Sequence, residues 1–310
     1  MSSIGLSRRI YSWLSIGLAL CALWGQGNAL PAQMTQAQNR PVANTPDSLG
    51  PRHSSSPNQT RTPGDQTGSR KTDMAKLSLL DQTRRHAAEF MNDLPNFVAT
   101  QIVTRYERKT GKSDWKKKDK AELELSYSSE TGEHYKVVRY NDKLAKLTYE
   151  KYVSKGANSP GDFGPILDDL FAAQSQAEFK EVRREIFHNR QCVLYDFRIK
   201  KAFSNRRIID LTSGRTITVG YSGSVWIDVE SGCALRIEQS ADDIEQGFPT
   251  TVYEEAVEYD WLDIDGKKRL LPVYSEMIIN NEPDDIYARN VMQMTNYHMF
   301  GTDVKIILEK

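Results

Sequence analysis

The sequence lacks the short motifs that mark most catalytic and cofactor sites. It contains no His-Glu-x-x-His helix, no Cys-x-x-Cys pair, no Gly-x-Ser-x-Gly elbow, no phosphate loop and no Gly-x-Gly-x-x-Gly turn. Cysteine and histidine are also scarce, with 3 and 5 residues in 310. We therefore predict no catalytic residues, no metal site and no cofactor, and interpret the protein as non-enzymatic.

One grouping brings a thiol, a base and a carboxylate within nine residues: Cys192, His188 and Asp196. A nucleophilic cysteine needs a lowered pKa, supplied by a helix N-terminus or a cationic neighbour. The pattern shows neither, because His188 and Asp196 fall on two strands joined by a turn. We interpret Cys192 as a small buried or strand-end residue.

The chain also lacks a net charge, since 41 basic side chains balance 41 acidic ones. Binding of nucleic acid requires a concentrated basic surface, so no nucleic-acid partner is predicted. The segment 105–120 is dense in lysine and arginine and contains Trp115, a composition that suits anionic lipid headgroups. Glu107, Asp114 and Asp119 interrupt that charge, and we interpret the segment as a solvated hairpin tip.

Long apolar runs are absent beyond the N-terminus. Residues 1–29 resemble an export signal, with Arg8 and Arg9, an apolar stretch over 13–24, and small residues at 27–29. The apolar stretch is too short to span a hydrocarbon layer of about 30 Å. A cleaved signal peptide is favoured over an anchor, with the Sec and twin-arginine routes both open. We expect a periplasmic or secreted protein with no stable membrane span after cleavage.

Residues 30–73 are rich in Gln, Asn, Pro, Ser, Thr and Gly and show no hydrophobic period. Such a segment buries too little apolar surface to offset its loss of conformational entropy. We predict a disordered linker over 30–73 and a single folded domain over 74–310.

The folded domain is organised around residues 223–239. Val225, Ile227 and Val229 alternate with polar neighbours, and a second alternating run follows the turn at 230–232. Two period-2 runs joined by a short loop containing glycine predict an antiparallel β-hairpin.

The same alternation predicts strands through most of the domain. An amphipathic helix precedes them and ends at Pro95, and one mid-chain helix begins at Pro165 and runs to about residue 175. Because neighbouring strands are joined by short turns, we expect a meandering antiparallel sheet and an α+β fold with about eleven strands. The predicted strands include 98–106, 121–127, 135–140, 144–152, 179–187, 193–199, 216–221, 250–262, 270–279, 287–300 and 304–308.

The hairpin also carries a family resemblance. The run Val225-Trp-Ile-Asp-x-x-Ser-Gly-x-x-Leu-Arg-Ile-Glu238 resembles the LolA/LolB-like superfamily, which includes periplasmic lipoprotein carriers and the RseB/MucB sensors. The N-terminal helix, mid-chain helix and export signal are similar too. The resemblance implies a large curved antiparallel sheet, an incomplete β-barrel wrapped over helices, which encloses an apolar cavity. It implies binding of a ligand or acyl chain, without chemistry.

We therefore predict an exported binding protein that holds a lipid or other apolar ligand in a half-barrel cavity. The alternative is an envelope stress sensor or protein-interaction module without a ligand, with an envelope protein as partner. Alternation along the strands and helical spacing after Pro165 supply the predicted cavity lining: Ile166, Leu170, Phe171, Tyr195, Phe197, Ile227 and Tyr259.

Two further expectations concern the hairpin and its neighbour. Cys192 and Cys233 should flank one intervening strand, about 9–10 Å apart, which exceeds the limit of about 7 Å between the Cα atoms of a disulfide. A bend at the strand ends would close the gap. Both alternatives, a disulfide between Cys192 and Cys233 and two free thiols, are therefore kept. Trp226, Asp228 and Arg236 are interpreted as a cross-strand cluster that fixes register.

Overall fold

The computed structural model describes residues 77–156, 163–210, 213–281 and 285–300. The predicted signal peptide at 1–29, the predicted linker at 30–73 and the predicted strand at 304–308 lie outside these ranges. From Ser78 onward the described residues belong to one compact unit. No helix in the described ranges is both long and apolar enough to cross a membrane.

The N-terminal helix, α2, spans Leu79–Asp93. Ser78 caps it, because the Ser78 hydroxyl accepts a hydrogen bond of 3.2 Å from the Asp81 backbone N–H. The chain leaves the helix at Leu94, directly before Pro95, and enters the first strand. The predicted helix and its stop are therefore confirmed.

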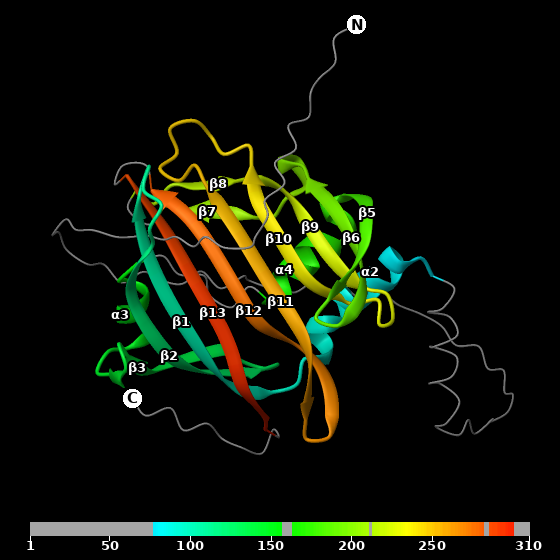
Figure 1. Cartoon of the computed structure of the whole chain (residues 1–310), viewed down its shortest axis with the longest axis horizontal. Coiled ribbons are helices and arrows are strands. Elements are labelled where there is room, and N and C mark those ends of the chain that lie inside the picture. The colour runs from blue at the N-terminus through cyan, green and yellow to red at the C-terminus, as the bar shows by residue number, and fades with distance from the viewer. Residues whose placement is uncertain (1–76, 157–162, 211–212, 282–284, 301–310) are drawn as a thin grey trace, which may run out of the picture. The chain divides into compact units, whose positions relative to one another are not determined.

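The main sheet contains eleven antiparallel strands in the order β4-β3-β2-β1-β13-β12-β11-β10-β9-β6-β5 (Figure 1). The edge strands β4 and β5 do not pair, so the described sheet is not closed and the predicted incomplete barrel is confirmed. The strands are β1 Phe97–Lys109, β2 Lys116–Ser128, β3 Gly132–Tyr140, β4 Lys143–Leu144, β5 Glu178–Phe187, β6 Arg190–Ile199, β9 Gly220–Asp228, β10 Ala234–Asp242, β11 Tyr253–Ile264, β12 Lys267–Asn281 and β13 Ile286–Met299.

The sheet is a meander with one long-range junction. The first described strand, β1, pairs with the last described strand, β13, with Thr104 opposite Val291. The chain therefore leaves the sheet at one edge, β4, and re-enters it at the other edge, β5. The expectation that every pair of neighbours is close in sequence is wrong at this junction, because short turns constrain only the strands that they join.

The segment between the two edges differs most from prediction. Residues 144–152 were predicted as a strand, but the chain forms only the short β4 and then helix α3, Tyr149–Val153. Thr148 caps this helix, and Tyr149, Tyr152 and Val153 follow the helical spacing that packs one face onto the sheet. Two mid-chain helices therefore stand where one was expected.

The second mid-chain helix, α4, spans Phe163–Phe171 and is followed by the 3-10 turn η1, Ala173–Ser175. Pro165 lies in its first turn, where a missing N–H is tolerated. The predicted strand 216–221 is divided: β8, Thr216–Thr218, pairs with β7, Arg207–Ile209, in a separate small sheet, and β9 begins at Gly220.

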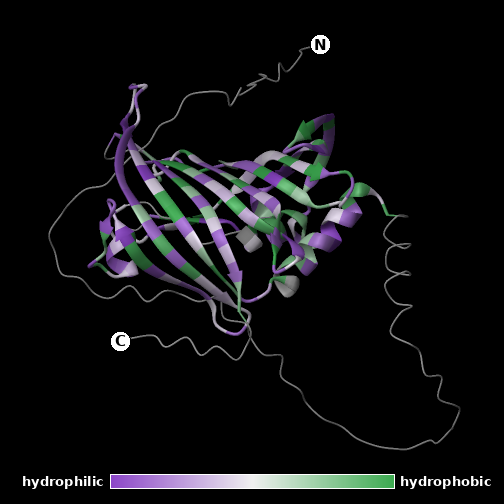
Figure 2. Ribbon diagram, turned by 60° about the horizontal axis from the view of Figure 1, so that its bottom comes forward, coloured by the Kyte–Doolittle hydropathy of each residue, from purple (hydrophilic) through white to green (hydrophobic). Residues whose placement is uncertain are grey.

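Hydrophobic and hydrophilic residues alternate along the strands of the main sheet (Figure 2). The largest core cluster joins the inward side chains of β6, β9 and β11 to the apolar faces of α2 and α4. Smaller clusters lie beneath α3 and beside β7 and β8. The helices therefore cover the sheet on the side that carries its apolar residues.

Candidate functional site

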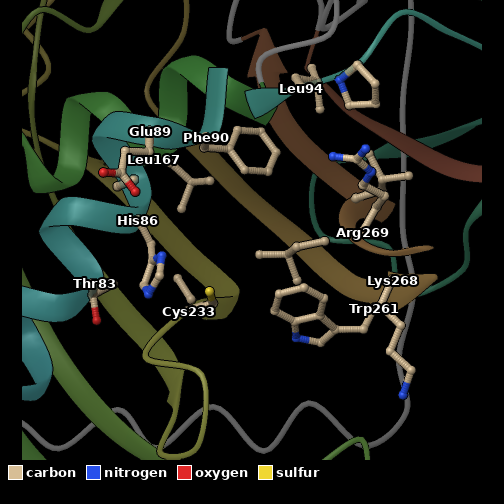
Figure 3. A pocket seen from close by; sticks show the side chains of 15 residues that line it. Thr83, His86, Glu89, Phe90, Leu94, Leu167, Cys233, Trp261, Lys268 and Arg269 are labelled. Carbon is tan, nitrogen blue, oxygen red and sulfur yellow. The ribbon is translucent and has the colours of Figure 1, made fainter. Parts of the chain in front are cut away.

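A cleft of about 180 Å³ lies between α2 and the end of the sheet where β11 turns into β12 (Figure 3). Its lining is mainly apolar, with charged side chains among the residues that border it. The lining residues are Thr83, His86, Ala87, Glu89, Phe90, Leu94, Pro95, Leu167, Cys233, Ala234, Trp261, Lys268, Arg269, Leu270 and Leu271.

Two turns form the walls opposite α2. In the β11–β12 turn, Asp265 and Gly266 adopt φ values of 53° and 73°, the paired left-handed conformation of a tight hairpin turn. This turn sets the register in which Trp261 lies directly across from Leu270. In the β9–β10 turn, Gly232 lies against α2 so closely that a Cβ there would be 3.0 Å from the Cβ of Gln82.

Aromatic rings bound the apolar part of the cleft. Phe90 projects from α2, and Trp261 projects from β11 on the opposite side of the space (Figure 3). Phe90 also makes an edge-on contact with Tyr259, with ring centroids 5.7 Å apart. This contact ties the helix to the core and leaves the other side of the Phe90 ring for the cleft.

The polar groups of the cleft are mostly hydrogen-bond donors. The indole Nε1 of Trp261 is buried and has no hydrogen-bond partner. None of the ion pairs between described residues involves Lys268, Arg269 or Glu89. The walls therefore offer one unsatisfied N–H, two cations and a single carboxylate.

The seven residues predicted to line a cavity are brought together, but in the packed core. All seven belong to the main core cluster, and the most exposed of them, Tyr195, shows 8% of its surface. None of them borders the cleft. The α4 residue that borders it is Leu167. Their contact with a ligand stays a prediction. The set is Ile166, Leu170, Phe171, Tyr195, Phe197, Ile227 and Tyr259.

The sequence reasoning missed the residues that border the cleft as a set. Phe90 and Leu94 lie in the predicted N-terminal helix and Trp261 in the predicted strand 250–262, and none of them was predicted to line a cavity. The signal available was the presence of large apolar residues at the ends of these elements. Which ends meet depends on the long-range packing of α2 against the β11–β12 turn, which alternation does not encode.

A second hollow, also about 180 Å³, lies on the opposite, polar side of strands β9 to β12. Its lining includes Ser222, Glu238, Glu254 and Glu276. Burial, followed by the neighbouring carboxylate of Glu276, raises the pKa of Glu254. Such a charged lining is unsuited to an apolar chain, so the cleft beneath α2 is the candidate site for one.

The predicted cross-strand cluster is confirmed for Trp226 and Arg236, whereas Asp228 has other partners. Arg236 lies opposite Trp226, with its guanidinium carbon 5.7 Å from the ring centroid. Asp228 is buried and accepts hydrogen bonds from Arg190, at 2.8 Å, and from the Ser231 hydroxyl, at 2.6 Å. These contacts fix the register and close the turn. Trp226, Asp228 and Arg236 do not themselves border the cleft.

Both cysteines in the described part of the chain are free and buried. Strand β9 lies between them, as expected: Cys192 pairs with Asp228, whose N–H in turn donates to the Cys233 carbonyl at 2.9 Å. Burial raises the pKa of each thiol to about 11. Neither sulfur is therefore a thiolate near neutral pH.

We expect Cys192 and Cys233 to resist a thiol reagent in the folded protein at pH 8 and to react fully once denaturant is added. Burial blocks access, and the raised pKa leaves little thiolate. Thiol titration with a chromogenic disulfide measures both states without a reductant. A denatured, exported chain with no reactive thiol would contradict the free cysteines.

Comparisons with known proteins give similarity at the level of structure only. No protein-family model and no curated protein matches the sequence. A Vibrio parahaemolyticus domain named for outer membrane lipoprotein sorting matches with 9% identity and a TM-score of 0.35, over 73% of this chain and 95% of that one. A LolA superfamily protein from Nitrosomonas europaea matches with 9% identity and a TM-score of 0.29, over 72% and 92%.

A third solved structure is the MucA/MucB complex of Pseudomonas aeruginosa, at 9% identity and a TM-score of 0.23, over 70% of this chain and 94% of the matched one. Of these three titles, the one from Nitrosomonas europaea names the LolA superfamily and the one from Pseudomonas aeruginosa names MucB.

Proposed function

We propose that this protein is an exported, non-enzymatic binding protein and that the cleft beneath α2 holds the apolar chain of a lipid. The observation that supports this most is the cleft itself, an apolar space of about 180 Å³ that adjoins α4 and lies between two aromatic side chains. Its place of action follows from the predicted export signal, and is periplasmic or secreted.

The walls of the cleft suit a hydrocarbon chain. Phe90, Leu94, Leu270 and Leu271 supply apolar contact from two elements. Each methylene moved from water into such surroundings gains about 0.8 kcal/mol, so a few methylenes supply a useful binding energy. The cleft is preformed, which lowers the entropic cost of binding.

The two cysteines in the described ranges are unsuited to act as nucleophiles near neutral pH, because burial raises the pKa of each thiol. The proposed binding therefore gives them no role beyond packing.

Filling the cleft tests the proposal. Ala87 is 5% exposed and borders the cleft from α2, whereas Ala88 is exposed on the same helix. We expect Ala87→Leu to weaken binding of the neutral fluorescent probe N-phenyl-1-naphthylamine at least tenfold, because the added side chain occupies the space of the ligand. The measurement is a fluorescence titration with the full chain.

Ala88→Leu is the matched control, since it makes the same chemical change outside the cleft and should leave probe affinity unchanged. Circular dichroism and the thermal midpoint establish that both variants are folded. Equal affinity of Ala87→Leu, Ala88→Leu and the parent protein would show that the probe binds elsewhere, and the proposal would fail.

The second candidate function is a protein-interaction module. Edge strand β5 exposes Val182 and Ile186, at 43% and 62%, beside backbone groups that no other described strand covers. A register shift between Glu181 and Arg183 disturbs this edge, and such irregularities oppose pairing with another strand. The cleft therefore supports ligand binding better than β5 supports a partner.

A further inference from the structure

The cleft beneath α2 is bordered by polar groups that an apolar chain alone does not explain. Three of them are hydrogen-bond donors: Trp261 Nε1, which is buried and has no partner among the described residues, and the side chains of Lys268 and Arg269. A buried N–H without an acceptor costs about 1–3 kcal/mol. The bound state therefore favours a ligand that brings an acceptor to this wall.

The charges around these donors are uneven. Lys268 lies directly opposite Asp263 on β11, and Asp265 follows in the turn. Arg269 instead lies opposite Leu262, and only part of its side chain is exposed. Asp263 thus offsets Lys268 in part, whereas Arg269 has no carboxylate as its cross-strand neighbour.

Figure 3 shows where the side chain of Arg269 lies in the cleft. Arg269 lies on the side of Leu94, at the end of α2, while Glu89 lies across the space on the helix (Figure 3). A planar guanidinium forms two parallel hydrogen bonds with a carboxylate or phosphate. The apolar residues between Phe90 and Trp261 are then left for the chain of the same ligand.

We propose that the ligand is an amphiphile with an anionic oxygen head group and that Arg269 binds this head group. This inference rests on the proposed function, since it assigns the head group of the chain that the cleft would hold. The shared chemistry is an anionic oxygen group, which a fatty acid supplies as carboxylate and a phospholipid as phosphate.

Three ligands with one chain length separate the head group from the chain: dodecanoate, dodecyl phosphate and dodecanol. The two anions are titrated below their micellar concentrations and dodecanol below its solubility limit, at pH 7.5, by displacement of N-phenyl-1-naphthylamine from the full chain. We expect at least one of the two anions to bind about tenfold more tightly than dodecanol, a difference of about 1.4 kcal/mol. The stronger anion identifies the head group as carboxylate or phosphate.

Two variants locate the preference. Arg269→Gln should remove most of the tenfold advantage of the anion and leave dodecanol affinity unchanged. Lys267→Gln, a basic residue of the same turn that does not border the cleft, is the matched control and should change neither.

Dodecanol binding as tightly as both anions, or an anion preference that survives Arg269→Gln, would overturn the head-group assignment and leave the apolar cleft in place. If none of the three amphiphiles displaces the probe, the assignment and the proposed function both fail.

Discussion

Asp119→Asn is expected to destabilise the folded domain by about 3–5 kcal/mol, the usual effect of breaking a buried ion pair from one side. Asp119 and Arg105 are 2% and 3% exposed, and the guanidinium binds the carboxylate through two hydrogen bonds, of 2.8 and 2.6 Å. An amide would place an N–H₂ group where the carboxylate now accepts. Arg105 would then be a buried charge without its counter-ion.

The Arg105–Asp119 ion pair also contacts the neighbouring strand β3 and helix α3. The Tyr140 hydroxyl donates to Asp119 at 3.0 Å, and Arg105 lies over the ring of Tyr152, 4.4 Å from its centroid. Since Tyr152 belongs to α3, loss of the pair should also loosen this helix. Hydrogen exchange should show faster exchange in α3 than in α2.

The measurement is equilibrium unfolding in urea, followed by circular dichroism. Asp142→Asn is the matched control, because Asp142 forms an ion pair with Lys120 at the surface, with exposures of 73% and 36%, and exposed pairs contribute about 0–1 kcal/mol. Replacing both partners, Arg105→Met with Asp119→Leu, should recover most of the stability. A loss below about 1 kcal/mol in Asp119→Asn would contradict the role given to this pair.

Gly223→Ala is expected to cost about 3 kcal/mol or more, at the upper end of overpacking effects. Gly223 lies in the middle of the hairpin strand β9, and a Cβ there would meet the Glu238 carbonyl oxygen at 1.8 Å and the Gln239 Cα at 2.8 Å. Both atoms belong to the backbone of β10, so no side-chain rotation relieves the overlap. The two strands would have to separate.

Gly156→Ala is its matched control, because the nearest atoms to a Cβ at Gly156 lie at 3.5–3.8 Å, an ordinary contact. Chemical denaturation of both variants gives the comparison. Similar stabilities for the two would show that β9 and β10 are less closely packed than the structure indicates.

Much of the fold follows from residue pattern. Alternation identified most strands. Asn141 and Asp142, with φ values of 50° and 64°, form the tight turn between β3 and β4. The two segments that the alternation pattern misassigned, 144–152 and 216–221, are short. Residues 144–152 carry apolar side chains at intervals that suit a strand locally, and packing of Tyr152 beneath the sheet decided for α3.

The candidate site was less predictable. Alternation tells which side of a strand is apolar, and the inward residues Tyr195, Phe197 and Ile227 are indeed buried. It does not tell what covers them. In this chain α4 and the neighbouring strands pack against them, and the open space lies instead where α2 ends beside the β11–β12 turn. The end of α2 and the β11–β12 turn are about 170 residues apart in the sequence.

The most direct test of the cleft as the ligand site is a crystal structure of the protein with a fatty acid brominated along its chain, because anomalous scattering locates the bromine without bias. We predict a bromine position between Phe90 and Trp261, beside Leu271. A bromine position within the core cluster, against Phe197 and Tyr259, would contradict the cleft and support the lining predicted from alternation. Bromine at neither place would contradict both.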